Sequence, residues 1–188
     1  PQVHKIFDPP GDAQFDAGLW SSLTEMGVPA IFVPEAFGGL GLQMIDLAIV
    51  AELLGSHVAP VPFLGHALAT VALTLGGSDA QKAQWLPKLA SGEALGTIAL
   101  GEGTSAWLPE EWTLSAADGT ISGEKRLVPN AAEADLIIVG TTQGLALVEK
   151  GASYATSRLD SADRTRPVDT VVFDGAVAQA MPADAAAI

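Results

Sequence analysis

The first quarter of the chain alternates apolar and polar residues with the period of an α-helix. Phe15, Leu19, Leu23 and Met26 recur at intervals of four, four and three residues, which places them on one apolar stripe. Gly27 follows at the position where helices commonly end, because glycine adopts the left-handed backbone conformation there without strain. This pattern predicts an amphipathic helix over residues 15–26.

Two more helices are predicted further along the chain. The apolar positions from Ile45 to Leu54 suit a helix that ends at Gly55. Ser78 and Gln81 match a capping box, in which each side chain accepts a hydrogen bond from the other residue's backbone N–H. Pro87 is expected to kink or split the helix that begins there, because proline has no N–H to donate and clashes with the preceding turn.

The stretch between these helices, residues 58–77, contains no Asp, Glu, Lys or Arg. Its length is near that of a membrane span. However, it carries Pro60, Pro62, Gly65 and His66, and it lacks the basic and aromatic flanks that are typical of a span. We therefore expect a helix that is buried on all sides within a soluble bundle, and no membrane span.

Past residue 92 the pattern changes to short β-branched runs separated by turn residues. Strands are expected near 95–101, 111–117, 120–125, 135–141, 144–149 and 168–173. Asp118-Gly119 predicts that the second and third of these form an antiparallel hairpin, since Asp-Gly supplies the positive φ that a tight turn needs. Many short strands in succession indicate a small barrel or sandwich.

The predicted fold class is therefore α+β. An N-terminal all-α helical domain, residues 1–92, is followed by a small antiparallel β-barrel or sandwich domain, residues 93–180. Residues 181–188 have the pattern of the first turn of another helix. We interpret them as the start of a truncated or missing C-terminal helical domain.

Composition removes several classes of function. The chain has 9 Lys and Arg residues against 22 Asp and Glu residues, a net charge of −13, which argues against nucleic-acid binding because an acidic surface repels phosphates. The absence of cysteine excludes disulfides and thiolate metal sites, and the three histidines fit no zinc spacing, so no metal site is predicted. With neither disulfides nor a signal peptide, a cytoplasmic location is expected.

Five segments, taken in order, resemble the acyl-CoA dehydrogenase superfamily. They are MGVPAIFVPEAFGGLGL at 26–42, LAIVAELLG at 47–55, SDAQKAQWLPKLASGEALGTIAL at 78–100, GEKRLVPNAAEADLIIV at 123–139 and VVFDGAVA at 171–178. The fourth segment follows the family's G-x-K-x-[FW]-I-[TS]-N-G-x-x-A-D strand pair without a gap. The resemblance covers nearly the whole chain from about Gly18.

This resemblance implies an FAD enzyme that forms the α,β double bond of an acyl-CoA. A carboxylate removes the α-proton while the β-hydride moves to the flavin, and the protein contributes positioning and charge stabilisation. In the family that carboxylate lies in the C-terminal helical domain or on a helix entering it. The resemblance therefore implies no catalytic residue within residues 1–188, and the chain by itself is expected to be inactive.

The first implied flavin contact is the loop after the first β-strand, which in the family reads T-E-P-x-A-G-S-D. By position, Leu100, Gly101 and Glu102 are the candidate cofactor-binding residues here, and Ser105 is the candidate substrate-binding residue. Gly101 replaces the family's Thr and Glu102 keeps the acid, while the Pro and the Ser-Asp end are lost or moved. Glu102 either orients the edge of a cofactor or faces solvent.

The second implied flavin contact is the aromatic-x-hydroxyl sequence of the G-x-K strand, where Leu127, Val128 and Pro129 stand. Leu127 can still pack on a ring face, but Pro129 removes both the hydroxyl and the backbone N–H. Losing two or three hydrogen bonds, at about 1 kcal/mol each, would weaken flavin binding by roughly one to three decades. FAD remains the implied cofactor, either bound by this chain or shared with or supplied by a partner subunit.

Arg158, Arg164 and Arg166 form one local basic group, which can meet a CoA or FAD phosphate or simply be solvated. Trp107 and Trp112 can wall a pocket or fill the core of the β-domain.

Three functions stay open: a catalytic flavoenzyme subunit, a non-catalytic partner in a heteromeric acyl-CoA dehydrogenase, and a flavin-free binding or structural module. The implied partners are an acyl-CoA substrate and a homo- or hetero-oligomer with another acyl-CoA dehydrogenase-like chain.

Overall fold

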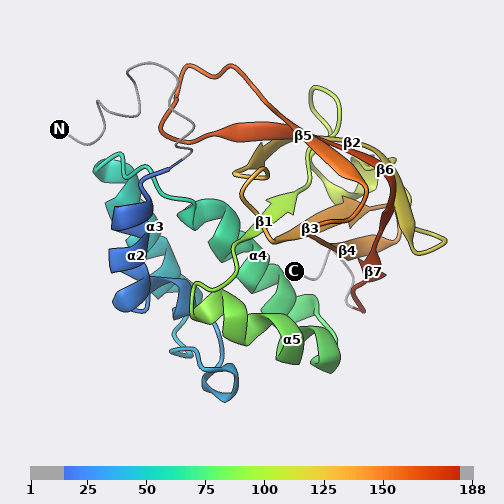
Figure 1. Ribbon diagram of the computed structural model, residues 1–188. Coiled ribbons are helices and arrows are strands. Elements are labelled where there is room, and N and C mark those ends of the chain that lie inside the picture. Colours follow the sequence, from blue (N-terminus) through green and yellow to red (C-terminus); the bar gives the residue numbers. More distant parts are fainter. Residues whose placement is uncertain (1–14, 183–188) are drawn as a thin grey trace.

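The computed structural model describes residues 15–182, and it shows helices first and strands afterwards (Figure 1). The predicted α+β class is therefore confirmed. The α-helices are α2 (Ala17–Glu25), α3 (Met44–Ser56), α4 (Phe63–Gly76) and α5 (Asp79–Ala90). The 3₁₀ turns are η1 (Val28–Ala30), η2 (Glu35–Phe37) and η3 (Pro109–Glu111). The strands are β1 (Gly96–Ala99), β2 (Thr120–Pro129), β3 (Leu136–Thr141), β4 (Gly144–Glu149), β5 (Tyr154–Arg158), β6 (Val168–Val177) and β7 (Gln179–Ala180).

The helix ends follow from the capping residues in the sequence. The Asp16 side chain accepts a hydrogen bond from the Leu19 N–H and starts α2, and Gly27, at φ 81°, follows the end of that helix as predicted. The capping box of α5 is also present, because Ser78 and Gln81 each accept a hydrogen bond from the other's backbone N–H.

Two helix predictions need correction. Of the kink or split predicted at Pro87, the split does not occur, because α5 continues to Ala90. The burial of Leu86 and Leu89 outweighs the hydrogen bond that proline cannot donate. Nor is α4 buried on all sides, because Leu64, Leu68 and Leu75 are exposed on one face of it. The opposite face packs on the β-strands and on α5.

The strands form two sheets rather than a closed barrel. One sheet has the order β1-β3-β4-β7 and the other has the order β2-β6-β5. The β3–β4 and β2–β6 pairs are antiparallel as expected, but β1 pairs with β3 in parallel. The barrel alternative and a wholly antiparallel arrangement are therefore wrong. A core cluster of residues from both sheets, including Val128, Ile137, Val139, Val171 and Phe173, fills the space between them.

The predicted hairpin at Asp118-Gly119 is also wrong. Residues 112–116 form no strand with β2, because side chains elsewhere capture their backbone N–H groups. Glu102 accepts hydrogen bonds from Thr113 and Leu114, and Gln143 accepts one from Ala116. β2 pairs instead with β6, which is distant in sequence. Strands β5 and β7 were not predicted.

The helical half and the strand half share one core at a close contact between α4 and β1. A Cβ on Gly96 would lie 2.9 Å from Ala69, and a Cβ on Gly65 would lie 2.7 Å from the Thr97 hydroxyl. Only glycine allows the backbones to approach this closely. The first residues of β1 are thereby held against α4, beside which the strand starts in Figure 1.

His66 lies at this contact and is completely buried. Its Nδ1 accepts a hydrogen bond from the Gly96 N–H at 3.3 Å, and Trp20 packs edge-on against its ring at 5.5 Å. Burial lowers the pKa of His66 to about 4, so the imidazole is neutral at physiological pH. His66 is a core residue of the contact between helices and strands.

Within residues 15–182, none of the helices has both the length and the apolar character that crossing a bilayer requires. The same part of the chain contains no cluster of His, Cys, Asp or Glu side chains that could hold a metal ion. The start of a further helix was predicted at residues 181–188, and residues 183–188 of this segment lie outside the described residues.

Candidate functional site

The two predicted flavin-contact segments lie side by side. The loop after β1 meets β2 where the Arg126 N–H donates a hydrogen bond to the Gly101 carbonyl at 2.9 Å. This single bridge places Leu100–Glu102 next to the β2 end that carries Leu127–Pro129. The structure therefore brings together the candidate cofactor residues that are about 25 positions apart in the sequence.

Gly101 is covered by Trp107 rather than left open. A Cβ at Gly101 would lie 3.1 Å from Cη2 of Trp107 and 3.1 Å from the Arg126 carbonyl oxygen. The family's Thr therefore has no room here unless the indole moves. Trp107 itself is 46% exposed, so its ring closes over the glycine and still faces solvent. The Trp107 ring therefore occupies the space beside Gly101 into which a side chain at that position would extend.

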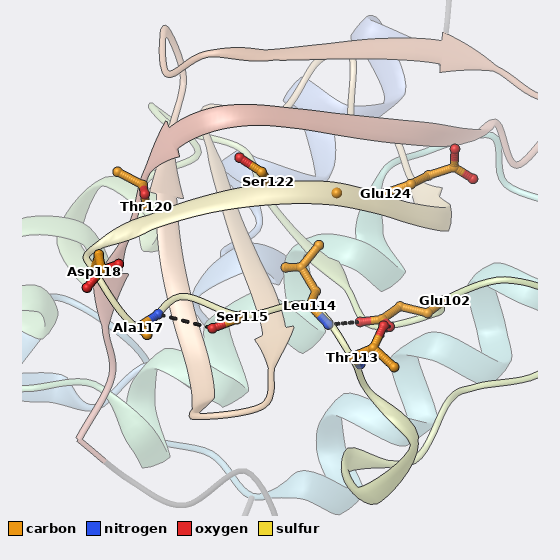
Figure 2. A pocket seen from close by; sticks show the side chains of 10 residues that line it. Glu102, Thr113, Leu114, Ser115, Ala117, Asp118, Thr120, Ser122 and Glu124 are labelled. Carbon is orange, nitrogen blue, oxygen red and sulfur yellow. Dashed lines mark hydrogen bonds between the residues drawn. The ribbon is translucent and has the colours of Figure 1, made fainter.

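The Glu102 carboxylate is bound by groups of the same chain. Its carboxylate accepts hydrogen bonds from the Lys125 ammonium at 2.6 Å, from the Thr113 N–H and hydroxyl at 2.7 Å each, and from the Leu114 N–H at 3.1 Å. Figure 2 shows the bond between Glu102 and Leu114. The solvent-facing alternative does not describe this arrangement, and the cofactor role of Glu102 stays a prediction. Glu102 holds the loop to the 113–114 segment and to β2.

Burial by itself would raise the pKa of Glu102, but the hydrogen bonds from Lys125, Thr113 and Leu114 outweigh it and lower the pKa to about 2. Lys125 is completely buried, and this desolvation lowers its pKa although the Glu102 charge opposes the change. The ammonium also donates to the Leu100 carbonyl at 3.0 Å and lies 5.0 Å from the Trp112 ring centroid. Sequence reasoning missed Lys125 as a site residue, although it stands at the Lys of the G-x-K motif, two residues after Gly123.

The β2 segment has only limited means of holding a cofactor. Val128 is completely buried in the core between the sheets, so only its backbone can reach a ligand. Pro129 has no N–H, and its carbonyl accepts a hydrogen bond from the Thr97 hydroxyl at 2.5 Å. Leu127 is different: it sits in a register irregularity of β2 at φ 56°, and its side chain is 47% exposed. It is the one side chain of the three that can pack on a ring.

Ser105 lies at the tip of a tight turn. The Glu102 N–H donates to the Ala106 carbonyl at 2.9 Å, and the Ala106 N–H donates back to the Glu102 carbonyl at 3.2 Å. These two bonds close the turn, and Ser105 is exposed on it. The Ser105 hydroxyl is therefore accessible, in keeping with its candidate role as a substrate contact.

A cavity of about 420 Å³ opens between residues 113–118 and β2, where the predicted hairpin would have been (Figure 2). Its lining includes Glu102, Asp118 and Glu124, together with the hydroxyls of Thr113, Ser115 and Ser122. It contains no Lys or Arg. A pocket with this charge repels the phosphates of FAD or CoA.

Two arginines of the predicted basic group form ion pairs with carboxylates of the same chain. Arg158 donates to Asp169 at 2.7 Å and lies 3.5 Å from Glu133, and the Arg166 Nε donates to Asp163 at 3.0 Å. Two of the three arginines are thus neutralised by neighbouring carboxylates. Their availability for a phosphate is correspondingly reduced.

Comparison with known proteins gives the context for this site. Residues 2–93 match the family model described as "Acyl-CoA dehydrogenase, N-terminal domain". The chain is 47% identical over 74 residues to (2S)-methylsuccinyl-CoA dehydrogenase of Cereibacter sphaeroides, a match that covers 38% of this chain and 14% of that protein.

Among solved structures, the chain resembles a Tcur3481-Tcur3483 steroid acyl-CoA dehydrogenase variant with a TM-score of 0.85 and 27% identity, over 96% of this chain and 51% of that chain. It resembles the ChsE4-ChsE5 complex from Mycobacterium tuberculosis with a TM-score of 0.81 and 25% identity, over 98% of this chain and 52% of that chain. The chain thus spans about half the length of the chains in these structures, and a smaller share of the Cereibacter sphaeroides dehydrogenase. By these matches, together with the helix and strand order, the chain belongs to the acyl-CoA dehydrogenase family.

Proposed function

We propose that this chain is a structural subunit of a hetero-oligomeric acyl-CoA dehydrogenase, with the flavin contacts and the catalytic base supplied by a second chain of the same family. The observation that carries the proposal is that the Glu102 carboxylate and the Pro129 carbonyl, one in each flavin-contact segment, already have hydrogen-bond partners within this chain. Glu102 binds Lys125, Thr113 and Leu114, and the Pro129 carbonyl binds Thr97.

The residues present do not fit an FAD site of the usual kind. Gly101 offers no hydroxyl and is covered by Trp107, and Pro129 offers neither a hydroxyl nor an N–H. The adjacent cavity has acidic side chains and no Lys or Arg in its lining, so it offers no basic group for a pyrophosphate. A cofactor that loses two or three hydrogen bonds of about 1 kcal/mol each binds more weakly by roughly one to three decades.

Two of the similar solved structures support a hetero-oligomer, because their descriptions name two different chains. The framework also supports it, because the family's order of helices and strands is kept while the flavin-contact segments are altered. In such an assembly the substrate class is an acyl-CoA thioester. The contribution of this chain is to shape and shield the assembly rather than to hold the cofactor.

Measuring FAD stoichiometry tests the proposal. The purified chain should be colourless and should not bind FAD in a fluorescence titration. Co-expression with a second acyl-CoA dehydrogenase-like chain should give a complex that contains FAD and both polypeptides. A stable homo-oligomer with one FAD per chain would overturn the proposal in favour of a self-sufficient flavoenzyme. A complex without FAD would favour a flavin-free module.

A further inference from the structure

Helix α3 is apolar on two opposite faces, and only one of them is packed. Its inner face, with Leu47, Val50 and Leu54, packs against a core cluster of the helical half. On the outer face, Ile45, Ile49 and Leu53 are 61%, 58% and 57% exposed. These three residues, here called the α3 stripe, are spaced four residues apart and therefore lie in one row along the helix.

An exposed row of this kind is unusual for a soluble helix. A helix that is hydrophobic all round is normally buried on all sides. Large apolar side chains in a row at i and i+4 are also the pattern with which one helix anchors another. Exposed patches of this kind mark interaction surfaces.

The charged residues of helix α3 are all acidic. From residue 15 to residue 81 the chain contains no Lys or Arg, and its acidic residues are Asp16, Glu25, Glu35, Asp46, Glu52 and Asp79. Asp46 and Glu52 lie on α3 itself, next to the α3 stripe. Among the described residues, no ion pair includes Glu52. A surface that covers the α3 stripe therefore meets carboxylates that have no cation nearby in sequence.

We infer that the α3 stripe docks a helix of a different polypeptide, whose own apolar stripe is flanked by Lys or Arg. The inference rests on the proposed hetero-oligomer and identifies a surface through which it forms. A second copy of this chain is a poor occupant, because pairing two α3 helices brings Asp46 and Glu52 of both copies together with no basic residue between them. Like charges that face each other suppress the wrong partner, and opposite charges select the right one.

Two synthetic helical peptides test this surface on the intact chain. Both carry the same leucine stripe, which is flanked by lysines in one and by glutamates in the other. In fluorescence anisotropy at low salt, the lysine peptide should bind at least about tenfold more tightly, and the preference should shrink as salt is added. Glu52→Gln should reduce the preference.

The substitution Ile49→Asp should weaken binding of the lysine peptide by about tenfold or more, because truncating a central apolar anchor commonly has an effect of this size. Asp adds negative charge, so a purely electrostatic attraction to lysines would become stronger, and a loss identifies the apolar contact. Val177→Asp, at an exposed position on β6, is the matched control and should leave binding unchanged. Ile49→Ala serves as a milder second variant, and circular dichroism checks that each variant is folded.

The inference is overturned if the two peptides bind equally, if neither binds, or if Ile49→Asp has no effect. It is also overturned if the chain alone forms a dimer that Ile49→Asp dissociates, because a second copy would then occupy the α3 stripe. These outcomes are separate from those of the FAD titration. Stoichiometric FAD on the chain alone would refute the proposed function without altering the peptide result.

Discussion

Replacing Lys125 with Met should lower the free energy of unfolding by about 3 kcal/mol, the lower end of the range for breaking a buried ion pair. The Lys125 ammonium is completely buried and donates to Glu102 at 2.6 Å and to the Leu100 carbonyl at 3.0 Å. Met retains the apolar volume and can still pack on Trp112, so little of the loss comes from a cavity. The cost arises because Glu102 keeps its charge, and its bonds to Thr113 and Leu114, but loses its cation.

Lys150→Met is the matched control. The Lys150 ammonium and the Asp135 carboxylate also lie within hydrogen-bonding distance, at 3.0 Å, but their side chains are 58% and 35% exposed. Exposed pairs contribute about 0–1 kcal/mol, so this variant should change stability by less than 1 kcal/mol or so. Urea unfolding followed by tryptophan fluorescence and circular dichroism measures both variants. For a chain of this size, about 3 kcal/mol corresponds to a Tm lower by roughly 6–12 °C.

A double-mutant cycle with Glu102→Gln separates the ion pair from the other contacts of each residue. The double variant should be less destabilised than the sum of the single variants, because neither buried charge is then left alone. The pH dependence gives a second check. The folded-state pKa of Glu102, about 2, lies below its ordinary value of 4.5, so its stabilisation is complete above pH 4.5 and is lost as pH falls toward 2. Equal costs for Lys125→Met and Lys150→Met, or strictly additive effects in the cycle, would refute this account of the loop.

Three further predictions use the same unfolding measurement. The folded-state pKa of His66 is about 4, below its ordinary value of 6.5, so its contribution to the free energy of unfolding is complete above pH 6.5 and is lost as pH falls toward 4. His66→Asn keeps an acceptor for the Gly96 N–H and should reduce the loss of stability over that pH range by about 3 kcal/mol. Parallel curves of stability against pH for the two proteins would contradict this. Gly101→Thr should destabilise the chain by roughly 1–2 kcal/mol through contact with Trp107, and adding Trp107→Ala should recover part of the loss; no recovery would place the strain elsewhere. Val58 follows the C-terminal cap of α3 at φ 50°, a conformation that costs a β-branched residue about 1–2 kcal/mol. Val58→Gly should therefore raise stability by about 1 kcal/mol, and a decrease would show that the valine side chain contributes more than its strain costs.

Local patterns predicted what depends on neighbours in the sequence. Helix α2 ends before Gly27 as predicted, and the predicted capping box at Ser78 and Gln81 starts α5, because caps act over three or four residues. The family motifs also located the candidate site, since they identified both segments that meet at the bridge between Gly101 and Arg126. These results need no knowledge of which parts of the chain meet in space.

Only the tertiary structure decided what those residues do. Asp118-Gly119 has the sequence of a hairpin turn, yet the preceding segment is drawn away because Glu102 and Gln143 capture its N–H groups and β6 pairs with β2. Glu102 is tied to Lys125 across about 23 positions, a pairing that neither residue's neighbours specify. Sequence periodicity sets which face of an element is apolar, but contacts between distant segments determine which polar groups are free to bind a ligand.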